Sequence, residues 1–237
     1  MKYSILLLLT CIIIPGCNKV EEDPPKNTTI TDIDGNPYGI IQIGNTWWMS
    51  ENLRTTRYCN GDTIPTNLSN TQWENTTSGA YAIYSHDKVD GINSEEEMVN
   101  AYGKLYNWYA VDDPRGICPE GWHVPTNEDF AILINHLGKV REAGEKLSSS
   151  RVRPNPHPRW RGRFRSGTNE SGFSAFPAGQ RAPRGGYSGI QYFGFWWTST
   201  EYNSYNARHR GLPYGYGFLG GPVQNKNFGF SVRCIKE

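Results

Sequence analysis

Residues 1–17 constrain this chain most, because they determine the compartment in which it folds. A short basic start that contains Lys2 is followed by Ile5 to Ile14, which is apolar except for Thr10. About ten apolar residues are too few to span a bilayer, which takes roughly twenty, but they fit the apolar region of a signal peptide. We therefore expect an exported protein that folds under oxidising conditions.

The cysteine after the apolar stretch predicts a lipid anchor. The run Ile14-Pro15-Gly16-Cys17 resembles a bacterial lipobox, in which the cysteine is lipidated and becomes the new N-terminus. We expect residues 1–16 to be a lipoprotein signal peptide. Acyl chains on Cys17 would then hold the protein on the membrane without a spanning helix. The alternative is ordinary cleavage at the small residues and an unmodified Cys17.

Residues 17–29 form a polar segment that includes Glu21, Glu22, Asp23 and two prolines. Such a segment cannot bury enough apolar surface to fold, so we interpret it as a tether. Its acids resemble the surface-export signal of Bacteroidota lipoproteins. That resemblance implies a lipid anchor in the outer membrane and exposure on the cell surface, and the alternative is a tether that faces the periplasm.

The remaining residues, 30–237, have the length of one domain. Without Lys2, the mature chain has 23 basic and 23 acidic residues. This zero net charge argues against bulk nucleic-acid binding. The whole chain contains 26 glycines, 15 prolines and 13% aromatic residues, which indicates short strands, many turns and long ordered loops.

Turn signals and apolar runs predict the strands. Asp34-Gly35-Asn36 and Gly44-Asn45 are hairpin-type turns that break residues 31–53 into short strands. From Phe164 onward the chain reads as strands and glycine-rich loops. The expected strands there lie in four runs: 171–176 (SGFSAF), 193–200 (FGFWWTST), 207–212 (ARHRGL) and 228–235 (FGFSVRCI).

Capping residues and apolar spacing predict the helices. Ser94 and Glu97 could form a capping box at a helix start. Thr126 can cap a second helix, in which apolar residues recur at i, i+3, i+4 and i+7 from Phe130 and which Gly138 would end. A shorter helix is expected around 141–148.

Six stretches occur in an order that identifies a family. They are 32–58, 102–111 (YGKLYNWYAV), 118–130 (CPEGWHVPTNEDF), 169–181 (NESGFSAFPAGQR), 195–202 (FWWTSTEY) and 228–234 (FGFSVRC). With them the chain resembles a Fibrobacter succinogenes major paralogous (FISUMP) domain, which we place at 30–237. The later motifs are also similar to the C-type lectin-like fold shared with formylglycine-generating enzymes. That resemblance implies an α+β domain with two helices, small antiparallel sheets and long loops.

Three cysteines remain once the signal peptide and the lipidated residue are set aside, namely Cys59, Cys118 and Cys234. In an oxidising compartment a pair is expected, with one thiol left over. C-type lectin-like domains commonly bond a cysteine near a helix to one near the chain end, so the resemblance implies a Cys118–Cys234 disulfide. Cys118 could otherwise be a nucleophile beside His123, but five residues apart is no established spacing for that pair.

No signature of catalysis, metal or cofactor is visible in the sequence. A formylglycine-type oxidase would need a cysteine pair in the C-terminal part, where only Cys234 lies. Residues 32–36 resemble the start of a calcium loop but lack the later glycine and glutamate of an EF-hand. Glu51, Glu170 and Glu201 are conceivable glycosidase acids, although hydrogen bonding to loop backbone is the commoner role.

A run of arginines is the first candidate for ligand binding. In a strand, one face would carry Arg159, Arg161, Arg163 and Arg165, spaced about 6.6 Å apart. Arg151 and Arg153 precede the run. Such a face could bind an anionic polymer such as an acidic glycan. The alternative, which we favour, is a solvated face that pairs with acids elsewhere.

Aromatic residues are the second candidate. In a strand, one ring of each adjacent tryptophan pair would face outward, where it could stack on a sugar ring. The candidates are Trp48, Trp197, Tyr187, Tyr192, Tyr214 and Tyr216. Core packing is the alternative for the tryptophans, and it is the commoner fate of such rings.

These patterns favour a surface-anchored lipoprotein that acts as a non-catalytic binding or adhesion module for a glycan or another extracellular ligand. An enzyme acting on polysaccharide and a structural envelope protein without a small ligand are the alternatives. A buried pair of carboxylates in one cleft would favour the enzyme. A surface without a concave site would favour the structural protein.

Overall fold

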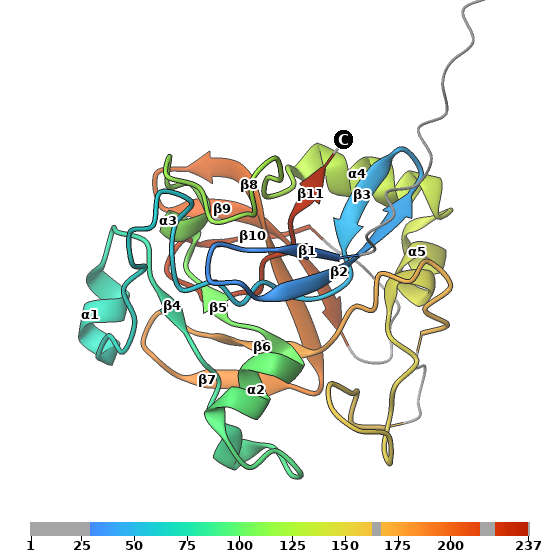
Figure 1. Ribbon diagram of the computed structural model, residues 1–237, viewed down its shortest axis with the longest axis horizontal. Coiled ribbons are helices and arrows are strands. Elements are labelled where there is room, and N and C mark those ends of the chain that lie inside the picture. The colour runs from blue at the N-terminus through green and yellow to red at the C-terminus, as the bar shows by residue number, and fades with distance from the viewer. Residues whose placement is uncertain (1–28, 163–166, 214–220, 237) are drawn as a thin grey trace, which may run out of the picture.

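The structure, a computed structural model, describes residues 29–162, 167–213 and 221–236. These residues form an α+β domain, as expected from the sequence (Figure 1). The strands are β1 (Thr29–Thr31), β2 (Pro37–Ile43), β3 (Thr46–Met49), β4 (Tyr81–Ala82), β5 (Leu105–Tyr106), β6 (Ala178–Arg181), β7 (Tyr187–Ile190), β8 (Phe193–Asn203), β9 (Asn206–Pro213), β10 (Val223–Asn225) and β11 (Ile235–Lys236).

All strand pairs in the described sheets are antiparallel, and the sheets are small. The largest sheet has the order β1-β2-β3-β11, so the first and last described strands belong to the same sheet (Figure 1). Its two hairpins turn at the predicted Asp34-Gly35-Asn36 and Gly44-Asn45. Gly35 and Gly44 both have positive φ, 81° and 64°, which explains why glycine stands in each turn.

A second sheet has the order β10-β9-β8, and two further pairs join β4 to β5 and β6 to β7 (Figure 1). The expected strands in 193–200 and 207–212 are therefore confirmed as β8 and β9. The run 171–176 is not a strand, and of the run 228–235 only Ile235 belongs to one, as the first residue of β11. Residues 229–231 form only isolated bridges, to Arg181, Tyr106 and Trp196, because three different segments surround this part of the chain.

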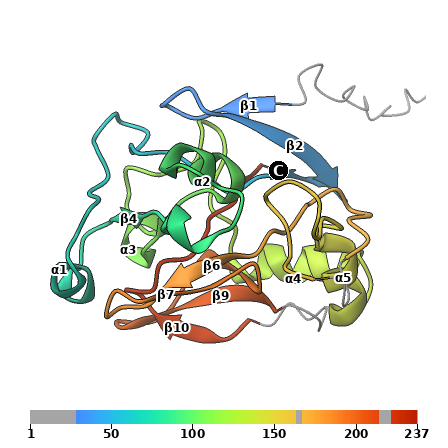
Figure 2. The ribbon, with the colours of Figure 1, turned by 90° about the horizontal axis from the view of Figure 1, so that it is seen from below.

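The described residues contain five α-helices, where the resemblance implied two. They are α1 (Asn70–Asn75), α2 (Glu95–Tyr102), α3 (Trp108–Val111), α4 (Asn127–His136) and α5 (Val140–Leu147), with a 3-10 turn η1 (His86–Lys88). The two missed helices, α1 and α3, have six and four residues, too short for an apolar period to appear. In both views α1 lies at one end of the domain, and α4 and α5 at the other (Figure 1, Figure 2).

The two predicted helices that had capping residues begin where those residues indicate, and the third, expected around 141–148, is α5. The Thr126 hydroxyl accepts a hydrogen bond from the Asp129 amide, and the Asp129 carboxylate accepts one from the Thr126 amide, which is a complete capping box. Ser94 caps α2 through the Glu97 amide. The Glu97 carboxylate accepts from the Asn93 amide, one residue earlier than a capping box requires.

Helix α4 packs its apolar face into the core beside the first sheet. Phe130 lies against Trp48, with ring centroids 5.1 Å apart, and Trp48 in turn contacts Phe173. Ile43 and Trp196, from two different sheets, belong to the same cluster. Burial of this face stabilises a helix that its length alone would leave marginal.

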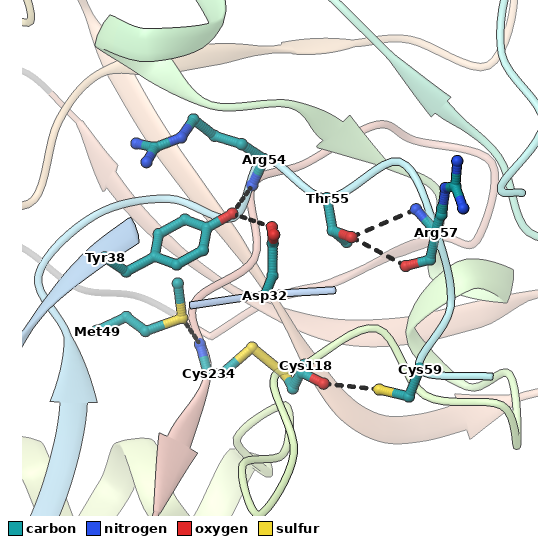
Figure 3. The surroundings of a disulfide bond; sticks show 9 residues. All are labelled: Asp32, Tyr38, Met49, Arg54, Thr55, Arg57, Cys59, Cys118 and Cys234. Carbon is teal, nitrogen blue, oxygen red and sulfur yellow. Dashed lines mark hydrogen bonds between the residues drawn. A yellow bond between two sulfur atoms is a disulfide. The ribbon is translucent and has the colours of Figure 1, made fainter. Parts of the chain in front are cut away.

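The disulfide expected between Cys118 and Cys234 is present (Figure 3). It joins the segment before α4 to the segment before β11, and 116 residues separate the two cysteines. Cys59 is a free cysteine, as expected, and its Sγ lies 2.8 Å from the Cys118 carbonyl oxygen (Figure 3).

Candidate functional site

The tryptophans proposed as sugar platforms are in the core. Trp48 is 1% exposed and Trp197 is 0% exposed, so neither ring can contact a ligand from outside. The expected inward and outward arrangement fails for Trp196 and Trp197, which are both buried. The reason is that both faces of β8 are covered here: Trp196 packs against Phe173, and Trp197 against Phe230.

The tyrosine candidates remain near the surface where the structure describes them. Tyr187 in β7 is 37% exposed and packs edge-on against Tyr84. Tyr192 is half-buried, with the Arg161 guanidinium 5.3 Å from its ring centroid. Tyr214 and Tyr216 lie outside the described residues.

The arginine run does not form a cationic strand face in its described part. Arg159 is 8% exposed; its guanidinium donates to the Asn155 carbonyl at 2.6 Å and pairs with Asp90 at 3.3 Å. Arg153 pairs with Asp90 too, so one acid far away in sequence is shared by two arginines of this loop. Arg161 is exposed, while Arg163 and Arg165 lie outside the described residues, as does Cys17.

A pocket of about 310 Å³ lies elsewhere, in a place that the sequence did not indicate. Four segments that are distant in the chain form its walls. They are residues 50–54 after β3, residues 100–103 at the end of α2, Arg151 with Pro158 after α5, and Ser174 with Phe176 before β6. The volume is at the lower end of the usual range for small-molecule sites, ~300–1,000 Å³.

Close packing of Asn52 against Gly103 shapes the inner wall. Gly103 ends α2 with a positive φ of 77°, and a Cβ at this position would lie 2.6 Å from the Asn52 Cβ. Only glycine allows the helix end to approach this closely without strain. The glycine in the stretch 102–111 therefore serves the pocket wall, a role that a single sequence cannot reveal.

Asn52 is also the centre of a buried hydrogen-bond network behind the pocket. Its Oδ1 accepts from Trp196 Nε1 and Arg233 Nε, both at 2.9 Å, and its Nδ2 donates to the Tyr102 carbonyl at 2.9 Å. Its Nδ2 also donates to Ser231 Oγ at 3.2 Å. One amide thus joins the first sheet, α2, β8 and the C-terminal segment.

Arg233 is fully buried within this network. Besides Asn52, its guanidinium donates to the carbonyls of Phe173 and Ser174, and it stacks on the Phe173 ring at 4.2 Å. Burial lowers the pKa of Arg233 to about 9, while the charge of Glu51 acts in the opposite direction. The side chain therefore remains cationic at neutral pH.

Charged groups on the pocket side are Glu51, Arg54 and Arg151. Glu51 Oε2 accepts from Arg54 Nη1 at 2.7 Å, and Glu51 Oε1 accepts from the Gly39 amide at 3.1 Å. The Arg151 guanidinium lies 5.8 Å from the centroid of the Phe176 ring. The pocket thus combines apolar surface, amide and hydroxyl groups, and an arginine, which suits recognition of a polar ligand with an apolar face.

The three glutamates considered as acids are not brought together. Glu51 lines the pocket, whereas Glu170 pairs with Lys146 at 3.6 Å on α5 and Glu201 pairs with Lys226 beside β10. Glu51 is the one carboxylate among the residues that line the pocket. A retaining or inverting glycosidase requires two carboxylates across the scissile bond.

The described residues offer neither a cluster of metal-ligating side chains nor a membrane-spanning helix. No group of three or more histidine, cysteine, aspartate or glutamate side chains in this part of the chain is placed to hold a metal ion. Within the same residues, no helix has the length and apolar character needed to cross a membrane.

Together the fold and the pocket define a disulfide-bonded α+β domain with a small polar pocket built on loops. The chain belongs to the family of the Fibrobacter succinogenes major domain, whose model matches residues 41–236. This confirms the family inferred from the six stretches. Among curated proteins and solved structures, no chain matches this one.

Proposed function

We propose that this chain is a non-catalytic binding module that takes a glycan in the pocket described above. The pocket itself carries the proposal: Pro158 and Phe176 line it beside the polar side chains of Ser50 and Asn100. Sugar rings have one apolar face and a rim of hydroxyls, so they need both kinds of contact. A single lining carboxylate, Glu51, supports binding over hydrolysis.

We also propose that the α+β fold is of the C-type lectin-like type. Three features support this assignment: β1 and β11 in one sheet, a disulfide from before α4 to before β11, and long loops between the strands. An experimentally determined structure that fails to superpose on C-type lectin-like domains would remove it.

The binding proposal is tested with the full-length chain in detergent on a broad glycan array, with and without calcium. A saturable hit is expected, and the variant Asn100→Trp, which fills the pocket from its rim, should abolish it. Asn135→Trp on the exposed face of α4 is the matched control and should leave it unchanged. A blank array contradicts the proposal and favours the structural envelope protein, and turnover of a bound glycan favours the enzyme.

The proposed setting is the outer surface of the outer membrane, through a lipid on Cys17 and the tether 17–29. The support is the lipobox-like run and the acids after it. Cys17→Ser should move the protein from the membrane to the soluble fraction, because the acyl chains would be missing. Retention of this variant in washed membranes contradicts the anchor, and protease treatment of intact cells separates surface from periplasmic exposure.

A further inference from the structure

Three guanidinium groups and one carboxylate surround the pocket. Both oxygens of Glu51 are engaged, one by Arg54 and one by the Gly39 amide. Arg54 therefore offsets the charge of Glu51. Its guanidinium donates through Nη1 to that carboxylate and through Nη2 to the Pro37 carbonyl. The positive charges of Arg151 and Arg233 remain.

Arg151 is the cation that can reach a ligand. It is exposed, it lines the pocket, and it forms no ion pair with any acid in the described residues. Its neighbours Arg153 and Arg159, by contrast, both pair with Asp90. The planar fork of Arg151 is therefore available for a bidentate contact of the kind that carboxylates make.

Arg233 adds to the positive potential from behind the wall. Its guanidinium contacts Asn52 and the Ser174 carbonyl, two residues that line the pocket. A buried charge acts over a longer range than one in water, because its surroundings screen it less. The carbonyl end of α2 opposes this with about half a negative charge, which leaves the pocket cationic.

We propose that the pocket takes one carboxylated sugar residue, such as a uronate or a sialic acid, whose carboxylate pairs with Arg151 and whose ring lies against Pro158 and Phe176. This inference rests on the proposed glycan-binding function. The volume of about 310 Å³ suits a single residue of a larger glycan rather than a long segment. We therefore assign the acidic-glycan site to this pocket and not to the arginine run considered from the sequence.

The test compares acidic oligosaccharides with their carboxyl-reduced counterparts, in which each carboxylate has become a neutral hydroxymethyl group. Uronate and sialylated oligosaccharides are titrated onto the full-length chain in detergent. Carboxyl reduction should weaken binding roughly tenfold or more, the effect of losing one charge-assisted pair. Arg151→Gln should weaken binding of the acidic form by the same factor and leave the reduced form unaffected.

Two further variants make the result specific. Arg184→Gln removes another exposed arginine and should change nothing. Arg151→Lys keeps the charge but not the fork, and should give intermediate affinity. If a glycan binds equally in its acidic and reduced forms, the carboxylate inference fails and the glycan proposal stands. If no acidic or neutral glycan binds, both fail.

Discussion

At the scale of single residues, this domain depends on polar side chains inside its core. The Asn52 side chain makes four hydrogen bonds and the Arg233 side chain makes three. The two residues are linked to each other through Asn52 Oδ1, which accepts from Arg233 Nε. A buried polar group without its partner costs about 1–3 kcal/mol, so networks of this kind tolerate few changes. His209 is the contrasting case: it is buried among aromatic rings, and its Nδ1 has no hydrogen-bond partner.

Asn52→Ala should lower the free energy of unfolding by about 3 kcal/mol or more, because it leaves the Trp196 indole, the Arg233 Nε and the Tyr102 carbonyl without partners. Urea denaturation measures this loss. Asn135→Ala, an exposed change on α4, is the control and should stay within about 0.5 kcal/mol of the parent. Equal stability of the two variants would show that the network contributes little.

His209 should make the fold sensitive to acid. Burial, with a smaller contribution from the charge of Arg210, lowers its pKa to about 4, against the influence of the Pro222 carbonyl. An unfolded histidine titrates near ~6.5, so between these two values the unfolded chain binds a proton that the folded chain does not. The unfolding free energy should therefore fall by up to about 3 kcal/mol as the pH drops from ~6.5 to ~4.

Comparison of variants isolates this effect from that of the carboxylates. In His209→Phe the unfolding free energy should fall less over the same pH range, since an aromatic ring without a titrating group fills the site. Asn135→Gln, a change without a titrating group at an exposed position on α4, should keep the parental slope. Parallel curves for the parent and His209→Phe contradict the prediction.

At the scale of elements, the turns and helix caps could be predicted from the sequence, because each depends only on neighbouring residues. The turns at 34–36 and 44–45 and the cap at Thr126 are local devices, because two to four adjacent residues determine each of them. For the arginine run, the favoured prediction was pairing with acids elsewhere in the chain, but the sequence could not name the partner of Arg159, which is Asp90, 69 positions earlier. The burial of Trp197 likewise depends on Phe230, which comes from another segment.

The pocket could not be predicted for the same reason. Its walls come from four segments, and only the fold brings Arg151 beside Phe176 and the end of α2. The disulfide was inferred from the family resemblance and not from the spacing of the cysteines. The family could be identified from the sequence because each of its motifs is a contiguous stretch of residues.

The capping box of helix α4 should contribute measurably to stability. Thr126→Ala should lower the unfolding free energy by about 1 kcal/mol, because the Asp129 amide loses its acceptor and the Asp129 carboxylate loses the threonine hydroxyl. Thr77→Ala in an exposed loop is the control. Thermal unfolding followed by circular dichroism separates the two, and identical midpoints would exclude a stabilising role for the cap.

At the scale of the whole molecule, one covalent bond joins two segments that lie far apart in the chain, inside a single hydrophobic cluster. The Cys118–Cys234 disulfide closes 116 residues of chain and lies beside Met49 and Tyr38 of the first sheet (Figure 3). Such a bond mainly reduces the freedom of the unfolded chain.

Replacing both Cys118 and Cys234 by alanine should lower the unfolding free energy by about 5 kcal/mol on the chain-entropy estimate. Cys59→Ala leaves the bond intact and should have little effect, so it is the matched control. Denaturation with and without a reductant gives an independent reading: the reductant should destabilise the parent and leave the double variant unchanged. A parent that withstands full reduction contradicts this account.

The position of residues 229–235 has a consequence for how the molecule is made. This segment bridges to Tyr106, Trp196 and His123, and it carries Arg233 and Cys234. A nascent chain that has not yet emerged past Gly229 therefore lacks the centre of its own core. The domain therefore cannot complete its core until synthesis has passed this point. A premature stop codon even a few positions before Ile235 should give an unfolded, protease-sensitive product rather than a shortened folded domain.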